Sequence, residues 1–329
     1  MIICGDALTE LRKLPDETIH CCVTSPPYWG LRDYGVPGQF GLERTPEEYV
    51  AKMVEVFREV RRVLRKDGTL WLNLGDSYAT PKEGNTQGTS TSALHYKNPQ
   101  EDLRQLREES KFKKLLPPGL KPKDLVGIPW RVAFALQADG WWLRQDIIWA
   151  KPNPMPESVR DRCTKAHEYI FMLSQSAKYW YDAEAVREPE KTTTNGRCSV
   201  RTSGDSTTGD KEHWGIPHER IQVERTYDEV KGANRRSVWT ITTKPMPKIF
   251  GQEHFATFPP EIPEICIKAG CPIGGIVLDP FFGAGTTGMV AKQLGRDFIG
   301  IELNQKYCEM AERQIAQVGY QPGLAMGNA

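Results

Sequence analysis

The residues from Ser25 to Tyr28 (SPPY) form an unusual end to an apolar segment. Adjacent prolines lack backbone donors, so they form a stiff, extended corner that cannot lie inside a helix or a central strand. Because no neighbouring amide satisfies the proline carbonyl oxygens, we expect these oxygens to accept hydrogen bonds from another group. The stretch therefore predicts a rigid set of acceptors beside an aromatic ring. In isolation, the same residues would suit a turn that only packs aromatic side chains.

A second stretch with residues suited to chemistry lies near the other end of the sequence. An apolar strand at 276–278 leads into Asp279 and then into the glycine-rich run 283–288 (GAGTTG), which a helix follows. Glycines permit a tight strand-to-helix turn and the close approach of a ligand, and Glu302 at the tip of the next strand can bind a ribose diol. The combination predicts a site for an adenosine-containing cofactor. The loop has no basic residue, which fits a cofactor without phosphates.

The pattern around these stretches alternates strands and helices. Apolar runs predict strands at 1–4, 19–24, 69–74, 142–149, 169–173 and 298–303, and helical spacing predicts helices at 7–14, 45–68 and 125–138. The 45–68 helix has Thr45 as its cap, Pro46 at its first position, Glu48 to complete a capping box and Gly68 as its end. Continuous apolar strands between helices favour a mostly parallel sheet covered by helices. We expect the 1–4 strand to complete the sheet beside the 298–303 strand.

Composition and charge restrict the class of protein. The sequence has 43 basic and 42 acidic residues, so a surface that binds nucleic acid would have to be local. Its eight cysteines include no CxxC pair, and Cys266 and Cys271 lack a nearby pair of histidines, so we expect reduced thiols and no metal site. The short apolar run at the N-terminus and the lack of an 18-residue apolar stretch predict a soluble, cytoplasmic protein with no membrane partner.

Together, the two stretches resemble the amino-methylating DNA methyltransferases that use S-adenosylmethionine, in the permuted order of the beta group. SPPY at 25–28 resembles the catalytic motif of that family, and DPFFGAGTTG at 279–288 resembles its cofactor motif. The segments 5–8 (GDAL) and 254–259 (HFATFP) are similar to further family segments, as are WLNLGDSY, DIIWAKPNPMP and HEYIFMLSQSAKYWYD. The resemblance covers nearly the whole chain except the polar segments 79–123 and 187–245.

The resemblance implies a Rossmann-like α/β methyltransferase fold. Its sheet would be circularly permuted, mostly parallel and seven-stranded, with helices on both faces and a loop-rich target-recognition region. We expect a catalytic half at 1–78, a flexible basic insertion at 79–123, the remainder of the catalytic sheet at 124–186, the target-recognition region at 187–245 and a cofactor-binding half at 246–329. Double-stranded DNA is the implied partner. A restriction endonuclease as a second partner, and a monomer or a homodimer, both stay open.

The resemblance also implies residue roles. Exocyclic amines of bases are poor nucleophiles because their lone pair is delocalised, and acceptors that hold both N–H groups localise it. The implied acceptors are the Ser25 hydroxyl and the Pro26 carbonyl beside Pro27, and Tyr28 would stack on the extruded base. Glu302 would bind the ribose and Asp6 would lie near the adenine. The implied cofactor contacts are Asp6, Ala7, Phe255, Ala256, Thr257, Pro259, Asp279, Phe281, Gly283, Gly285, Thr286, Thr287 and Glu302.

We expect the two polar segments to bind DNA in different ways. Lysines are point charges suited to the phosphate backbone, whereas Arg and Asn side chains can also read base edges. The expected phosphate contacts are Lys111, Lys113 and Lys114, and the expected base contacts are Asn195, Arg197, Arg201, Asn234, Arg235 and Arg236.

Other activities fit the sequence less well. Within the resembled family, Ser at the first motif position is associated with N4 of cytosine, but N6 of adenine stays the alternative because Ser and Asp both supply an acceptor oxygen. Ring-carbon methylation would need a Pro-Cys pair, which the sequence lacks. A non-catalytic DNA-binding relative would be expected to lose an acceptor or the glycines. A nicotinamide-dependent oxidoreductase would leave SPPY without a use. We regard both as remote alternatives.

Overall fold

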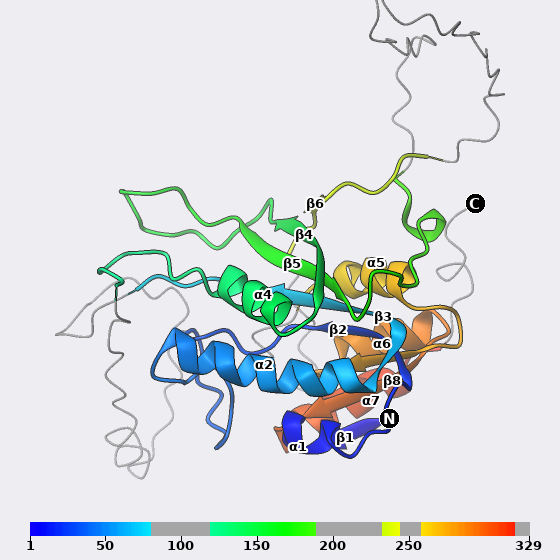
Figure 1. The fold of residues 1–329 in the computed structure, drawn as a ribbon. Coiled ribbons are helices and arrows are strands. Elements are labelled where there is room, and N and C mark those ends of the chain that lie inside the picture. Colours follow the sequence, from blue (N-terminus) through cyan, green and yellow to red (C-terminus); the bar gives the residue numbers. More distant parts are fainter. Residues whose placement is uncertain (80–118, 189–231, 244–257, 320–329) are drawn as a thin grey trace, which may run out of the picture.

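The structure is a computed structural model of the 329-residue chain, and it describes residues 1–79, 119–188, 232–243 and 258–319. The described strands form one eight-stranded sheet in the order β1-β8-β7-β2-β3-β5-β4-β6 (Figure 1). All neighbouring strands pair in parallel except β3 with β5 and β5 with β4. The strands are β1 (Ile2–Cys4), β2 (Ile19–Thr24), β3 (Leu64–Leu74), β4 (Trp142–Ala150), β5 (His167–Ser174), β6 (Val238–Thr240), β7 (Ile276–Asp279) and β8 (Asp297–Glu302). The mostly parallel sheet and the position of β1 beside β8 confirm the sequence prediction.

Helices cover both faces of this sheet. The helices α1 (Ala7–Leu11), α2 (Pro46–Val63) and α4 (Ile128–Ala138) share one apolar core, which also contains Cys22 and Leu72 of the sheet. The helices α5 (Glu261–Gly270) and α6 (Thr286–Gln293) pack on the other face, against Cys21 and Trp71. Neighbouring strand residues therefore enter opposite cores, as the pleat of a strand requires. The last helix, α7 (Gln305–Ala316), packs on α6, β1 and β8, and η1 (Glu184–Val186) is a single 3-10 turn beside α5.

The long helix α2 begins as predicted and ends earlier than predicted. The Thr45 hydroxyl accepts the Glu48 amide at 3.2 Å, and Pro46 is the first helical residue. The Glu48 carboxylate accepts the amide of Arg44 at 3.0 Å, so the expected capping box on Thr45 does not close. Leu64 is extended and pairs with Ile19 of β2. The prediction that Gly68 ends the helix is wrong, because pairing with β2 draws residues 64–68 into β3.

Within the described residues the sheet has eight strands, one more than the predicted seven, because β6 pairs in parallel with β4. Trp239 of β6 is buried, and the indole of Trp149 donates to the Ile241 carbonyl at 2.8 Å. Three strand residues at the end of a polar segment are too few to show a period of two in the sequence. Part of the segment 187–245, expected to recognise the target, therefore belongs to the sheet edge. The implied circular permutation stays a prediction.

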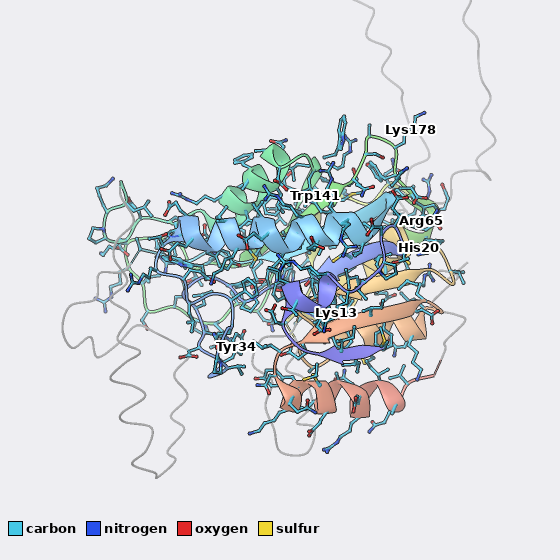
Figure 2. All side chains as sticks on the ribbon, turned by 60° about the horizontal axis from the view of Figure 1, so that its bottom comes forward. Lys13, His20, Tyr34, Arg65, Trp141 and Lys178 are labelled. Atoms are coloured by element: carbon cyan, nitrogen blue, oxygen red, sulfur yellow. The ribbon has the colours of Figure 1, made fainter. Side chains whose placement is uncertain are left out.

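The strands place their carboxyl ends on one side of the molecule. There β1, β2, β3, β7 and β8 end together, and β5, which is antiparallel to β3, begins. Figure 2 shows that Tyr34, which follows β2, lies far from His20 and Arg65 near the starts of β2 and β3. In open α/β sheets, ligands bind outside the carboxyl ends of the strands. Within the described ranges, no helix is long and apolar enough to cross a membrane.

Candidate active site

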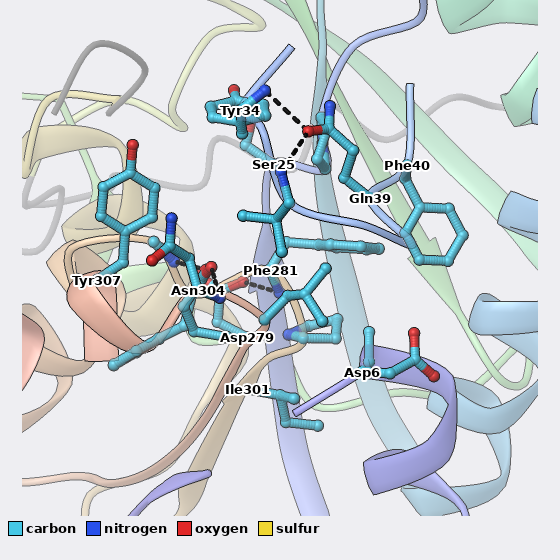
Figure 3. Close-up of a pocket in the computed structure, with 18 of the residues that line it drawn as sticks. Asp6, Ser25, Tyr34, Gln39, Phe40, Asp279, Phe281, Ile301, Asn304 and Tyr307 are labelled. Atoms are coloured by element: carbon cyan, nitrogen blue, oxygen red, sulfur yellow. Dashed lines mark hydrogen bonds between the residues drawn. The ribbon is translucent and has the colours of Figure 1, made fainter. Parts of the chain in front are cut away.

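One pocket lies at the carboxyl ends of β1, β2, β7 and β8 (Figure 3). Ser25 and Pro27 from the first stretch line it together with Asp279 and Glu302 from the second stretch. The fold therefore joins two stretches that are separated by most of the sequence. The predicted residues that line the pocket are Asp6, Ala7, Ser25, Pro27, Asp279, Phe281, Gly283, Thr286, Thr287 and Glu302.

The glycine loop, residues 280–285, connects β7 to α6, and its residues 280–283 line the pocket. Gly283 (φ 54°) and Gly285 (φ 89°) have left-handed backbones, which favour glycine. A Cβ on Gly285 would also lie 2.8 Å from the Cβ of Ala311 in α7. The Gly283 amide donates to Glu302 Oε2 at 2.8 Å, and the Asn304 amide donates to Glu302 Oε1 at 2.8 Å. Glu302 thus holds the loop against the end of β8, and burial raises the pKa of its carboxyl group.

Asp279 ends β7 at the base of the pocket and is 2% exposed. Its Oδ1 accepts the Thr24 hydroxyl at 2.6 Å and the Phe281 amide at 3.1 Å, and its Oδ2 accepts the Thr287 hydroxyl at 2.7 Å. Burial raises the pKa of the Asp279 carboxyl group to about 6, although these hydrogen bonds favour the ionised form. A positive charge bound above this residue would lower that pKa again.

The walls of the pocket suit a cationic ligand with an aromatic part. The described lining residues include the acids Asp6, Asp279 and Glu302, but no Lys, Arg or His. Phe40 and Phe281 form an edge-to-face pair with ring centroids 5.4 Å apart on one side of the pocket, and Figure 3 shows Tyr34 and Tyr307 along another part of its wall. The Thr286 hydroxyl is buried and has no hydrogen-bond partner among the described residues, so it is available to a ligand.

Several pocket residues were not predicted as site residues. Tyr34, Val36, Gln39 and Phe40 come from the segment after SPPY, in which the Gln39 side chain accepts the Tyr34 amide at 2.8 Å. The other unpredicted lining residues are Gly5, Phe258, Pro280, Phe282, Ile301, Leu303, Asn304 and Tyr307. In the sequence these residues are marked only by lying near the predicted motifs. That nearness does not show which side chains face the pocket.

The proline corner, residues 25–28, follows β2 directly. The Pro27 carbonyl accepts the Tyr49 hydroxyl at 3.0 Å, so that carbonyl already has a partner within the protein. The Pro26 carbonyl accepts no hydrogen bond from the described residues, although Pro26 itself is buried and does not line the pocket. A Cβ on Gly75 would lie 2.5 Å from the Tyr28 ring, so the end of β3 needs glycine to admit that ring.

A polar group that the sequence interpretation missed surrounds the Tyr28 hydroxyl. This group, called here the Glu168 cluster, consists of Ser25, Tyr28, Asn73, Lys151 and Glu168. Tyr28 donates to Glu168 Oε2 at 2.6 Å, and Lys151 forms an ion pair with Glu168 Oε1. Burial, followed by the charge of Glu168, raises the pKa of the Tyr28 phenol well above its usual value, so the hydroxyl keeps its proton. Asn73, Lys151 and Glu168 lie in quoted family segments but carried no predicted role.

The remaining predicted residues that the structure describes do not line the pocket. Tyr28 and Gly285 are not among the lining residues, and Pro259 lies next to the lining residue Phe258. Arg236 forms an ion pair with Glu188 at 2.9 Å, and Arg235 lies over the Trp239 ring at 5.3 Å. Both arginines precede β6, whereas the pocket lies beyond the carboxyl ends of the strands. Phe255, Ala256, Thr257, Lys111, Lys113, Lys114, Asn195, Arg197 and Arg201 lie outside the described residues.

Comparisons with known proteins point to one family. A family model described as DNA methylase matches residues 19–313. The Type II methyltransferase M.Cfr9I of Citrobacter freundii is 45% identical over 311 residues, which cover 94% of this chain and 86% of that protein. The Type II methyltransferase M.SmaI of Serratia marcescens is 46% identical over 320 residues, which cover 95% of this chain and 90% of that protein.

Solved structures show the same fold. The PvuII DNA methyltransferase (cytosine-N4-specific) has a TM-score of 0.60 at 18% identity, covering 95% of this chain and 85% of that chain. A putative DNA modification methylase from Thermus thermophilus, solved in complex with S-adenosyl-L-methionine, has a TM-score of 0.55 at 21% identity, covering 98% of this chain and 94% of that chain.

Proposed function

The chain belongs to the DNA methylase family that methylates exocyclic amines, and from that premise we propose that it transfers a methyl group from S-adenosylmethionine to the N4 amine of cytosine in double-stranded DNA. One observation carries this proposal: Ser25 lines the same pocket as Asp279, Gly283 and Glu302. The residues expected to hold the amine and those expected to hold the methyl donor are thus neighbours. Such closeness is the first requirement for a direct transfer between two bound groups.

The lining of the pocket fits S-adenosylmethionine. This cofactor has a sulfonium and an ammonium group but no phosphate, and the pocket offers acidic side chains without a described basic one. Each Glu302 oxygen accepts one amide and keeps a lone pair that a ribose hydroxyl can use. Asp279 and Gly283 would lie along the methionine part, and Asp6 near the adenine. When bound, S-adenosylmethionine supplies an electrophilic methyl group.

The proline corner would prepare the amine for attack. The Ser25 hydroxyl and the Pro26 carbonyl would each accept one N–H bond, which localises the nitrogen lone pair. The Pro26 carbonyl suits this role because no described residue donates to it, whereas Tyr49 already occupies the Pro27 carbonyl. Tyr28 would pack on the extruded base and offset part of the cost of flipping, which is a few kcal/mol. The choice of cytosine rests on Ser25 at the first motif position and its resemblance to N4-specific members.

Recognition of the DNA sequence is assigned to residues outside the described ranges. We keep the segment 187–245 as the base-reading region, with Asn195, Arg197 and Arg201 as its contacts. The lysines at 111–114 would hold phosphates. Arg235 and Arg236 are weaker candidates for base contacts, since a tryptophan ring and a glutamate already engage them. Exchange of 187–245 for the matching segment of a relative should change the methylated sequence.

The direct test is to identify the methylated base. Duplex DNA containing all sequence contexts is incubated with the protein and a donor with a deuterated methyl group. The DNA is then digested, and its nucleosides are separated and weighed by mass spectrometry. We expect labelled N4-methylcytosine, and we expect it to be lost when Ser25→Ala replaces the acceptor hydroxyl. Labelled N6-methyladenine would overturn the choice of base while keeping the reaction class, and an unlabelled digest would overturn the proposed activity.

A further inference from the structure

The Glu168 cluster has more polar contacts than are needed to hold an aromatic ring. Glu168 is the second residue of β5, opposite Trp149 of β4, and it points toward the proline corner from a neighbouring part of the sheet. The side chains of Glu168 and Lys151 are 15% and 17% exposed. Burying most of an ion pair costs desolvation energy. Such pairs are often found where one of the two charged groups lies within hydrogen-bonding distance of a reactive residue.

The hydrogen bonds of the cluster run in one direction, from the pocket to Glu168. The Ser25 hydroxyl donates to the Tyr28 hydroxyl at 3.3 Å, and the Tyr28 hydroxyl donates to Glu168 Oε2 at 2.6 Å. Because Ser25 donates its own proton away from the pocket and accepts only the long 3.4 Å contact from Asn73, one lone pair of its hydroxyl remains to accept an N–H bond from a substrate. The chain of donors therefore leads from the proposed amine site to a carboxylate.

Asn73 fixes this chain without taking part in proton transfer. Its Nδ2 donates to Tyr28 Oη at 2.9 Å, to Glu168 Oε2 at 3.1 Å and to Ser25 Oγ at 3.4 Å. A side-chain amide donates hydrogen bonds but does not accept a proton near neutral pH. The carboxylate is thus the only strong proton acceptor among the described residues that touch the Tyr28 hydroxyl.

We infer that Glu168 is a positioning residue that receives, through Tyr28 and Ser25, the proton that the amine loses on methylation. The inference rests on the proposed role of Ser25, but it holds for cytosine and for adenine alike. It adds a residue from β5 to a site that was predicted only from the two motifs.

The proton transfer balances without a further reactant. Methyl transfer leaves the amine nitrogen positively charged with one proton in excess. An N–H bond breaks as Ser25 Oγ gains that proton, the original Ser25 proton moves to Tyr28 Oη, and the Tyr28 proton moves to Glu168 Oε2. Ser25 and Tyr28 end neutral, the methylated amine is neutral, and Glu168 becomes a carboxylic acid that later releases its proton to water. During the attack, the negative carboxylate also stabilises the charge that develops on nitrogen.

Two lysines and a tyrosine surround the Glu168 carboxylate. Lys151 of the segment after β4 pairs with Glu168, and the Lys165 ammonium lies nearby and donates to the Asp76 carbonyl at 2.9 Å. Burial lowers the pKa of Lys165, whereas Asp76 and Glu168 raise it. The Tyr28 phenol is the other titratable group that faces the carboxylate.

The test uses Glu168→Gln, which keeps the size of the side chain and an oxygen for the Tyr28 hydroxyl but cannot take the proton. Single-turnover methyl transfer is measured at saturating donor and DNA, from pH 5 to 8.5. We expect the rate to fall about 10²-fold, the lower end of the range for acid–base catalysis. We also expect the wild-type rate to decrease toward low pH and this decrease to be absent in the variant.

Three comparisons separate proton acceptance from simple support of the ring. Tyr28→Phe keeps the ring but breaks the chain, so it should slow transfer about as much as Glu168→Gln, and the double variant should be no slower. Glu157→Gln removes a similar ion pair, with Arg162 at 2.6 Å, and should leave the rate unchanged. DNA affinity and the fluorescence of 2-aminopurine at the target position should match wild type in all variants, which checks binding and base extrusion separately.

Two results would overturn the inference while leaving the proposed function intact. The first is a Glu168→Gln rate within about twofold of wild type, far below a typical acid–base contribution. The second is a double variant whose loss is the product of the single losses. If wild-type protein itself methylates no DNA, the proposed function fails instead.

Discussion

We expect Asp279 to make the binding of S-adenosylmethionine dependent on pH. The side chain is buried at the base of the pocket, and its pKa is raised to about 6. A bound cation favours the ionised carboxylate, so binding should lower this pKa and release protons. The affinity for S-adenosylmethionine should therefore be at its maximum above pH 7 and should decrease as the pH falls through 6.

The magnitude follows from the pKa. A carboxyl group with a pKa of about 6 is almost fully ionised at pH 7.5 and only about one-tenth ionised at pH 5. If the protonated form binds the cation poorly, the dissociation constant should be about tenfold higher at pH 5. Burial also raises the pKa of Glu302, which would add to this change. The Asp279→Asn variant shows how much of the change in dissociation constant with pH comes from Asp279.

The free protein should show the opposite trend in stability. A carboxyl group whose pKa is raised by folding is favoured in its protonated form, so its contribution to stability is present at low pH and is lost as the pH rises through about 6. The difference between about 6 and the usual 3.8 corresponds to about 3 kcal/mol. Asp279→Asn removes the free-energy cost of ionising this buried carboxyl group, but it also disturbs the hydrogen bonds to Thr24 and Thr287. The free variant should therefore differ little from wild type in stability at pH 8.

Isothermal titration calorimetry tests both parts of the binding prediction. Titrations of S-adenosylmethionine at pH 5, 6 and 7.5, in buffers with different ionisation enthalpies, give the affinity and the number of protons released. Wild type should release protons near pH 6, and Asp279→Asn should bind weakly with little change over this range. A wild-type affinity that is constant from pH 5 to 7.5 would refute the reasoning, as would an unchanged pH dependence in the variant.

Three further changes should affect separate parts of the site. Glu302→Gln should weaken cofactor binding by about 1–3 kcal/mol, because it removes a charged acceptor and disturbs the Gly283 contact, and calorimetry would detect an unchanged affinity as a contradiction. Gly75→Ala should abolish methyl transfer in a folded protein, since its Cβ would lie 2.5 Å from the Tyr28 ring, whereas Gly319→Ala, with open space around it, should match wild type in activity and melting temperature. Neutralising Lys111, Lys113 and Lys114 should lower the slope of log K for DNA binding against log salt concentration by about 0.9 per lysine, and the methylated sequence should stay the same. A changed sequence would contradict the assignment of phosphate contacts to these lysines.

The parts of the site that the sequence predicted are those that depend on short segments. The turn after β7 needs glycine at Gly283 and Gly285 and an acid at the next strand end, and each requirement is met within 24 residues of Asp279. The order of β1 beside β8 could likewise be predicted, because a sheet with Glu302 at its edge needed one more parallel strand. Local geometry and the rules of parallel sheets were sufficient there.

The Glu168 cluster could not be assembled in the same way. Glu168 reaches Tyr28 only because β5 runs antiparallel to β3 and therefore begins where β3 ends. The sequence shows an apolar strand at this point but not its direction. The end of α2 was misplaced for a similar reason, since Leu64 is suited to a helix and becomes extended through its pairing with Ile19. Contacts between distant segments decided both outcomes.

The pairing of β1 with β8 also determines how early during synthesis on the ribosome the pocket can form. Ile2 lies opposite Gly300, and the Gly5 amide donates to the Glu302 carbonyl at 2.9 Å. At about 5–20 residues per second, β8 is synthesised roughly 15–60 s after β1, and during this time the first strand has no partner on that edge. The cofactor pocket needs both strands, so a nascent chain that already carries the complete proline corner still cannot enclose a methyl donor. Synthesis thus supplies the proline corner well before the strand that completes the pocket beside it.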